Sequence, residues 1–232
     1  MPFNFNLEEG AIIPVDKPYG WTSADVVRKV KFMLQKKTGL KNIKVGHAGT
    51  LDPLATGLLL LCVGKATKQA ERLQAEEKEY VAHIRLGATT PSFDLEKEID
   101  HTYPFAHITR EAVEQALQQL TGTQEQVPPV FSAKLIGGKR AYTLAREGKA
   151  TEMKPALVTI YEMEIQHFAL PELTIRIACS KGTYIRSLAR DLGVALQSGG
   201  HLTGLRRTRS GKYPVSDAFS VADIENKLRT KS

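Results

Sequence analysis

Residues 46–63 have the sequence GHAGTLDPLATGLLLLCV, and this stretch decides the fold. Its second part, residues 58–63, is an unbroken apolar run of the length expected for a strand buried on both faces. The first part is rich in Gly, Thr, His, Asp and Pro, which predicts a loop leading into that strand. A polar loop against a buried strand holds functional side chains on a rigid scaffold. Asp52 is the carboxylate of this loop, and Pro53 restricts its backbone to extended conformations. The alternative is that Asp52 only caps the next turn.

Periodic patterns predict alternating helices and strands along the rest of the chain. Thr22 and Asp25 fit a capping box ahead of a helix that ends near Gly39. Residues 80–86 alternate between apolar and polar positions, which is typical of a half-buried strand. By the same criteria we expect helices over 66–74, 109–120, 139–147, 183–196 and 221–228, and strands over 157–168, 173–179 and 204–212. This order predicts an α+β fold in which a mixed, largely antiparallel central sheet is flanked by helices and loops.

The composition is that of an ordinary globular protein. Of 232 residues, 42% are hydrophobic and 25% are charged. Cys62 and Cys179 are far apart in apolar runs, which argues against a disulfide framework and fits a reducing compartment. We see no signal peptide at the N-terminus, and the longest apolar run is too short to cross a bilayer. The sequence therefore predicts a cytoplasmic protein without a membrane segment.

Positive charge is concentrated in two segments. The net charge is +7, and the pI is about 9.3. Residues 28–44 hold seven basic side chains and residues 201–212 hold four, with no acidic side chain in either segment. Both segments flank the motifs described below, and the pattern suggests a polyanionic partner. The alternative is a solvated basic face without a partner.

The sequence does not match the motifs of phosphate-binding loops or metal sites. The region from Gly57 to Lys65 superficially resembles a phosphate loop, but six residues separate Gly57 from Gly64 and Ala66 stands where Ser or Thr is required. The six histidines show no metal-ligand spacing with carboxylates or thiols. We therefore expect no metal and no cofactor.

The complete sequence of the Asp52 loop resembles a known family signature. Residues 46–57, GHAGTLDPLATG, closely resemble the signature of the TruB family of tRNA pseudouridine synthases. Further blocks agree in order: residues 16–23 (DKPYGWTS), 78–80 (KEY) leading into 85–87 (RLG), and 179–188 (CSKGTYIRSL) followed by 205–207 (LRR). The resemblance covers nearly the whole chain and implies the pseudouridine synthase fold, with one catalytic domain over 1–232.

The resemblance implies a chemistry that needs no cofactor, metal or energy source. Family members cleave the bond from ribose to the uracil nitrogen, rotate the detached base and re-form the bond to carbon. Asp52 then corresponds to the nucleophile, because a carboxylate can attack covalently and later leave. Arg186 corresponds to the arginine that pairs with it, and Tyr80 to the tyrosine that stacks on the target base. The alternatives are an exposed helix face for Arg186 and a core position for Tyr80.

Three more positions match the binding site of the family. Tyr184 and Leu205 correspond to residues that line the uracil pocket, with core packing as the alternative. His47 corresponds to a histidine that fills the space left in the RNA stack by the flipped base, with a loop histidine bonded to the backbone as the alternative. From charge, and not from the family motif, we predict that Lys29, Lys36, Lys44, Arg206 and Arg207 contact the RNA backbone. Lys17 and Pro18 are expected to support the site without taking part in the chemistry.

The resemblance predicts a monomeric tRNA pseudouridine-55 synthase, an intramolecular transferase that acts on the T stem-loop. The sequence departs from the pattern in two places. Many members carry a C-terminal PUA-like domain, for which we expect no room here, so affinity for tRNA must rest on the catalytic domain. Many members also have Thr-Asp after the glycine of the tyrosine strand, whereas here the first carboxylate after Gly87 is Asp94. Two alternatives stay open: the same reaction on another RNA, and a non-catalytic protein that binds or folds tRNA.

Overall fold

The apolar run of residues 58–63 belongs to strand β3 (Ala55–Val63). The computed structural model describes residues 9–131, 135–136, 139–140 and 153–229. Its internal contacts divide the chain into unit 1, Met1–Tyr80 with Leu205–Ser232, and unit 2, Val81–Gly204. Strands β4 (Lys78–Leu86) and β12 (Gly200–Ser210) have residues in both units. The single catalytic domain that we expect over the whole chain stays a prediction.

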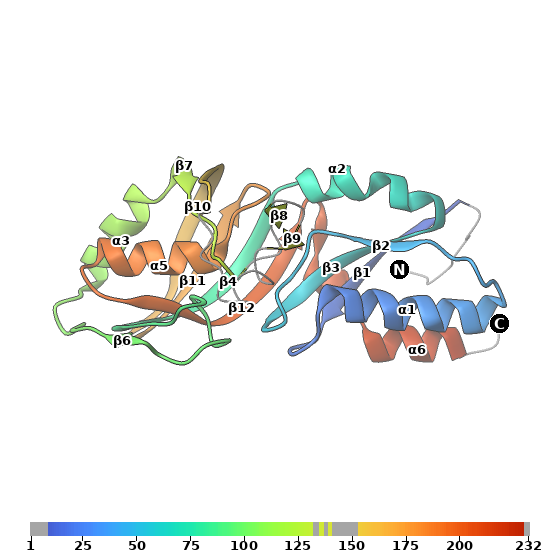
Figure 1. Cartoon of the computed structure of the whole chain (residues 1–232), viewed down its shortest axis with the longest axis horizontal. Coiled ribbons are helices and arrows are strands. Elements are labelled where there is room, and N and C mark those ends of the chain that lie inside the picture. Colours follow the sequence, from blue (N-terminus) through green and yellow to red (C-terminus); the bar gives the residue numbers. More distant parts are fainter. Residues whose placement is uncertain (1–8, 132–134, 137–138, 141–152, 230–232) are drawn as a thin grey trace. The chain divides into compact units, whose positions relative to one another are not determined.

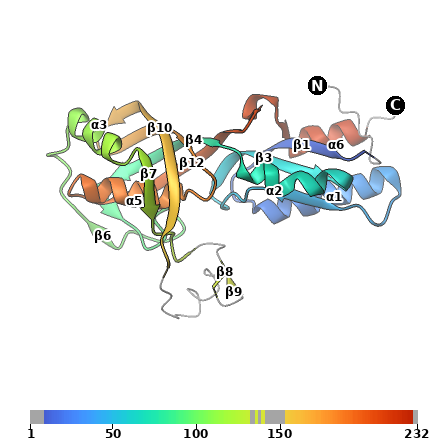
Figure 2. The same cartoon turned by 90° about the horizontal axis from the view of Figure 1, so that it is seen from above.

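Strand β3 is buried on both faces, as its composition predicts. Leu59, Leu61 and Val63 pack into a cluster with helices α1 (Ser23–Thr38) and α6 (Val221–Arg229). Leu58 and Leu60 pack on the opposite face with side chains that include Leu73 of α2 (Ala70–Ala75). Figures 1 and 2 show this layering in unit 1, with α1 and α6 on one side of the strands and α2 on the other. Because successive strand residues point to opposite faces, an unbroken leucine run supplies both layers.

The strands of unit 1 form a mixed arrangement around β3. β1 (Ala11–Lys17) pairs with it antiparallel, and β14 (Phe219–Ser220) continues beyond β1 in parallel. Along its other edge β3 pairs in parallel with β12, from Leu205 opposite Ala55 to Arg207 opposite Gly57, and then antiparallel with β2 (Val45–Ala48). β13 (Tyr213–Pro214) pairs with the end of β12. The loop between β2 and β3 thus leads directly into a strand that pairs with three others, β1, β2 and β12.

Helix α1 has the ends that its sequence predicts. The Thr22 side chain accepts a hydrogen bond from the Asp25 N–H, and the Asp25 carboxylate accepts one from the Thr22 N–H (2.8 Å), so the capping box is confirmed. Gly39 closes the helix in the left-handed conformation with φ 74°. The Asp25 carboxylate keeps its charge easily, because hydrogen bonds from Thr22 lower its pKa to about 2.

Unit 2 is a sheet with helices packed on it. Its hydrogen-bonded order is β4, β11 (Glu172–Cys179), β10 (Ala156–Ala169) and β7 (Gly122–Gln126), and the β10 pairs with β11 and β7 are antiparallel. Helices α3 (Arg110–Gln119) and α5 (Ile185–Ala195) lie side by side in Figures 1 and 2. Along β4, Tyr80, Ala82, Ile84 and Leu86 are buried, whereas His83 and Arg85 are exposed, which confirms the predicted alternation.

The fold class is confirmed as α+β with a mixed, largely antiparallel sheet, and most predicted elements are present within a few residues. The segment predicted as one helix over 66–74 is a 3₁₀ helix, η1 (Gly64–Gln69), followed by α2. The helix predicted over 139–147 is wrong at its start, because Lys139–Arg140 form β9, which pairs with β8 (Leu135–Ile136). The remainder of that segment, 141–147, lies outside the described residues. The other short elements are β5 (Ala88–Thr89), β6 (His101–Thr102) and η2 (Val215–Asp217). No helix within the described part of the chain is long and apolar enough to span a membrane.

Replacing Gly57 by alanine tests how closely β3 and β12 approach. Gly57 has φ 98°, and a Cβ at this position would meet the backbone oxygen of Arg207 and its nitrogen at 2.8 Å. We expect Gly57→Ala to lower the free energy of unfolding by about 3 kcal/mol, from backbone strain and overpacking together. Urea denaturation measures this change. Gly46→Ala is the control, because a Cβ there meets nothing within 4 Å, and its effect should stay within about 0.5 kcal/mol. Equal unfolding midpoints for the two variants would contradict the prediction.

Candidate active site

Asp52 lies on the loop between β2 and β3, in unit 1, and is half-buried between buried Leu51 and exposed Pro53. Its backbone carbonyl accepts a hydrogen bond from the Ala55 N–H (3.1 Å), which turns the chain into β3. The next residues therefore enter a strand that packs on both faces, so the loop has a rigid base.

The Asp52 loop is bonded to the connection between β1 and α1. The Gly20 N–H donates to the Pro53 carbonyl (2.9 Å). The Ser23 hydroxyl accepts from the Leu51 N–H (2.9 Å) and donates to the Leu51 carbonyl (3.2 Å). These bonds hold the residues on both sides of Asp52, so its backbone is fixed by the fold and not by the loop alone.

Lys17 is a fully buried cation at the end of β1. Its Nζ donates to the carbonyls of Trp21 (2.5 Å), Pro18 (3.0 Å) and Pro53 (3.2 Å). Desolvation lowers the pKa of Lys17 from 10.5 to about 8, while the charge of Asp52 opposes this change and the charge of Arg207 adds to it. The supporting role predicted for Lys17 therefore has a physical form: one buried ammonium joins both loops and acts electrostatically on the carboxylate.

Arg207 belongs to this support and not to the RNA-facing surface. The side chain is 1% exposed, and its guanidinium donates to the carbonyls of Leu58 (2.6 Å) and Gly49 (3.0 Å). The prediction that Arg207 contacts the RNA backbone is therefore wrong, because a buried, bonded guanidinium cannot reach a phosphate on the surface. Sequence alone did not separate it from Arg206, its neighbour on β12.

The other basic residues predicted to bind RNA lie at the surface of unit 1. Lys36 and Lys44 are exposed. Lys29 pairs with Glu225 of α6 (3.6 Å), and Arg206 makes two bonds to the Asp16 carboxylate (3.0 and 2.7 Å). Exposed ion pairs are weak and exchange readily, so RNA contacts by these four residues stay predictions.

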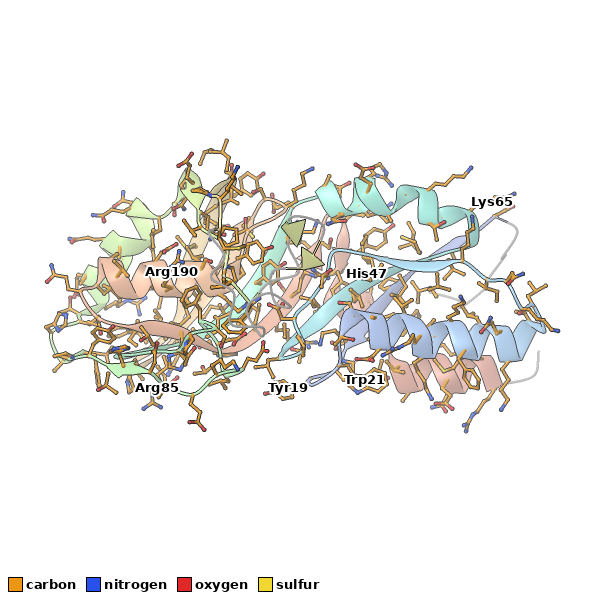
Figure 3. All side chains as sticks on the ribbon, in the orientation of Figure 1. Tyr19, Trp21, His47, Lys65, Arg85 and Arg190 are labelled. Carbon is orange, nitrogen blue, oxygen red and sulfur yellow. The ribbon has the colours of Figure 1, made fainter. Side chains whose placement is uncertain are left out.

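Three more predicted site residues belong to unit 1. Leu205 is half-buried and opposes Ala55 in the parallel pairing of β12 with β3, and its carbonyl accepts from the Thr56 hydroxyl (3.5 Å). His47 is half-buried on β2, and Figure 3 shows its side chain above those of Tyr19 and Trp21, which belong to the β1–α1 connection. Tyr80 is 8% exposed on the buried face of β4. The roles of all three in substrate binding stay predictions.

Arg186 is buried in unit 2 and forms an ion pair. It is 3% exposed, so the alternative of an exposed helix face is wrong. Its Nη1 lies 3.6 Å from the Asp94 carboxylate and 3.4 Å from the Ser92 carbonyl, to which it donates. Asp94, whose role the sequence left open, is itself 6% exposed. Because Arg186 and Asp52 belong to different units, their predicted pairing stays a prediction.

The turn before Asp94, which brings its carboxylate to Arg186, contains a residue in the left-handed conformation. Phe93 has φ 62°, in the left-handed region, and its N–H donates to the Thr90 carbonyl (3.0 Å). The Thr90 hydroxyl donates to the Asp94 carbonyl (2.7 Å). Arg190 lies one helical turn after Arg186 on α5. Its guanidinium carbon lies 4.9 Å from the centre of the Phe93 ring, over the ring face. This turn positions Asp94 despite the extra residues before it.

Tyr184 is the N-cap residue of α5 and is held by a glutamine that the sequence did not indicate. The Tyr184 N–H donates to the Gln126 side-chain oxygen (2.8 Å), and the Gln126 amide donates to the Tyr184 carbonyl (3.1 Å). Gln126 is 3% exposed at the end of β7. No local motif marks this residue, because its partner lies 58 positions away. Among the described residues, no group of three or more His, Cys, Asp or Glu side chains is arranged to hold a metal ion.

The pKa of Lys17 predicts a pH dependence of stability. Between pH 8 and pH 10.5 the folded state has lost the Lys17 proton while the unfolded state retains it, so unfolding takes up a proton. The contribution of Lys17 to stability therefore rises with pH, by roughly 3 kcal/mol across this window. Urea denaturation from pH 7.5 to 10.5, with Lys17→Met as the reference, isolates this contribution. Parallel stability profiles for the two proteins would show that the Lys17 pKa is not lowered.

Replacing Arg207 tests its assignment to the scaffold. We expect Arg207→Met to lower the free energy of unfolding by about 3 kcal/mol, because two buried carbonyls lose their donor. Arg206→Gln removes an exposed ion pair on the same strand, so its effect should stay below about 1 kcal/mol. Urea denaturation compares the two variants at one pH. A larger loss for Arg206→Gln would reverse the assignment.

Comparison with known proteins places the chain in a family. The family model of the TruB family pseudouridylate synthase N-terminal domain matches residues 35–185, and that of the tRNA pseudouridylate synthase B C-terminal domain matches residues 186–232. A protein of Phocaeicola vulgatus named tRNA pseudouridine synthase B is 59% identical over 93% of this chain and 92% of its own length. A protein of Flavobacterium johnsoniae with the same name is 50% identical over 95% of this chain and 97% of its own length.

Solved structures agree with the fold. The chain is similar to one in the crystal structure of a Cbf5-Nop10-Gar1 complex, with TM-score 0.72 and 28% identity. The similarity covers 97% of this chain and 56% of the other, so this chain spans about half the length of that structural relative. A second neighbour is from an H/ACA RNP bound to a substrate RNA containing 2'-deoxyuridine, with TM-score 0.68 and 26% identity over 97% of this chain and 55% of the other. With family models matching across residues 35–232 and close relatives over almost the full length, the chain belongs to the TruB family of pseudouridylate synthases.

Proposed function

We propose that this protein isomerises uridine 55 in the T loop of tRNA to pseudouridine, with Asp52 as the nucleophile. The observation that carries the proposal is the anchored Asp52 loop, in which buried Lys17 and Arg207 bind the backbone on either side of the carboxylate. Relatives that share more than half of the sequence over nearly its whole length are named tRNA pseudouridine synthase B.

The reaction is an isomerisation, so no atom is gained or lost overall. The bond between ribose C1′ and uracil N1 breaks, the base rotates, and a bond forms between C1′ and C5. The proton that leaves C5 is balanced by the one that N1 gains. Asp52 attacks as a carboxylate, either at C1′ or at C6 of the base, and leaves again as the product forms. The charges of Lys17 and Asp52 attract one another.

The other predicted residues receive roles in binding and orientation. Tyr80 offers an aromatic face to the flipped base. Tyr184 and Leu205 line the uracil pocket, and His47 fills the space that the base leaves in the RNA stack. Arg186 is the arginine that pairs with Asp52, and Asp94 keeps the guanidinium oriented by the ion pair within unit 2.

The partner is tRNA, which the protein binds as a monomer in the cytoplasm. A uridine inside a folded loop is stacked, so the enzyme must extrude it at a few kcal/mol. Phosphate contacts by Lys29, Lys36, Lys44 and Arg206 offset this unfavourable step, and their contribution should fall as the salt concentration rises.

Substitution of the nucleophile tests the proposal. We expect wild-type protein to convert the T-loop uridine of an unmodified tRNA transcript, as mapped by a pseudouridine-specific chemical reaction. Asp52→Asn should reduce turnover by at least about 10⁴-fold while folding and tRNA binding persist, because the amide has lost its nucleophilic charge. Asp217→Asn, an exposed carboxylate of unit 1, is the matched control and should retain full turnover.

Each contrary result has one meaning. Full activity of Asp52→Asn would remove the nucleophile assignment. Conversion at another uridine or in another RNA would remove the substrate assignment. Binding of tRNA without any conversion by the wild type would favour a non-catalytic tRNA-binding protein.

A further inference from the structure

We propose that a groove on α1, beside the Asp52 loop, binds an unpaired nucleotide of the RNA that neighbours the modified uridine. The groove, called here the α1 groove, is lined by Gly20, Trp21, Asp25, Arg28, Lys29 and Phe32. This inference rests on the proposed function for the identity of the RNA, but it assigns a binding surface that the motif residues do not include.

The α1 groove presents aromatic rings at the surface. Its volume is about 510 Å³, within the range of small-molecule sites. Phe32 is 62% exposed and is the large apolar side chain that α1 leaves at the surface, and Tyr19, adjacent to Gly20, is 60% exposed. Trp21 is partly buried against the core beneath α1 and also lines the groove. Flat rings beside basic side chains are how proteins hold unpaired bases, since each base has a face that can stack.

The charge around the groove fits RNA. Residues 28–44, which include most of α1, hold seven basic side chains and no acidic one. At the groove itself Arg28 pairs with Asp25, and Lys29 pairs with Glu225 (3.6 Å). The Arg28 side chain is 76% exposed, so its pairing is weak and a phosphate can compete for the guanidinium. A neutral apolar ligand would not use this charge, whereas a nucleotide uses both the rings and the cations.

The groove and the nucleophile share one bonded scaffold. Gly20 lines the groove and donates to the Pro53 carbonyl (2.9 Å), and the Trp21 carbonyl accepts from Lys17 (2.5 Å), which also donates to Pro53. Ser23, at the first turn of α1, is bonded to Leu51 in both directions. A nucleotide held in the α1 groove is therefore held at a fixed position relative to Asp52, which is what selection of one uridine among its neighbours requires.

The single tryptophan of the chain makes the groove directly observable. Trp21 is the only tryptophan, so intrinsic fluorescence reports on the groove itself. We expect an unmodified T stem-loop RNA to quench this fluorescence at saturation. Because Asp52→Asn prevents turnover under the proposed function, the same titration with that variant should give the same quenching. An unchanged spectrum at RNA concentrations that saturate binding in a filter assay would overturn the proposal.

Substitutions at the exposed rings separate stacking from general binding. Phe32→Ala and Tyr19→Ala should each raise KM for the stem-loop about tenfold, with kcat within twofold, because a stacked base loses its platform. Phe32→Tyr should restore KM, since it retains an aromatic face. Leu40→Ala, an exposed apolar residue just after α1, is the matched control and should leave KM unchanged. The exposure of Phe32 makes loss of folding unexpected, and urea denaturation checks it.

The two proposals fail in different ways. If the wild type shows no turnover but Trp21 is still quenched and Phe32→Ala weakens that binding, the proposed function fails and the groove stands. If turnover is normal but the KM values of Phe32→Ala and Tyr19→Ala equal that of Leu40→Ala, the groove fails and the proposed function stands. Arg28→Gln adds a test of the phosphate contact, because it should lower the slope of binding against log salt by about one.

Discussion

The structure around the Asp52 loop depends on two buried cations, Lys17 and Arg207. Burial of Lys17 and Arg207 removes their hydrogen bonds to water, which is unfavourable. Hydrogen bonds to backbone carbonyls of the loop and its neighbours compensate for this loss. Buried carbonyls in turn need donors, and the two cations supply them. The arrangement therefore holds an irregular segment in one conformation, and it does so with a positive charge that interacts with Asp52.

Strand β3 supports the loop that these cations bind. Because each of its faces packs in a different cluster, a shift by one residue would exchange the side chains of the two clusters. Its parallel pairing with β12 brings Arg207 opposite Gly57, and only a glycine leaves room for that approach. One strand register thus decides both where the loop begins and where Arg207 enters the core.

Unit 2 uses the same principle with a different pair of groups. Arg186 and Asp94 are both buried and form an ion pair, in which each charge compensates the other. Their helix and turn are held by Gln126 and by the left-handed Phe93, which lie far from Arg186 in sequence. A polar site on this family's scaffold is therefore supported by residues that no short motif contains.

Sequence alone determined the elements and the identity of the chemical groups. The leucine run predicted a buried strand, the Thr22–Asp25 pair predicted a helix start, and the Asp52 segment matched a family signature. These features are local, since periodicity, capping and motif spacing lie within a few residues of one another. Tertiary structure alone decided that Arg207 is scaffold whereas neighbouring Arg206 faces outward, that Asp94 reaches Arg186, and that Phe32 is exposed on α1. Burial and pairing depend on which distant segments pack together, and a charge count along the chain contains no information about that.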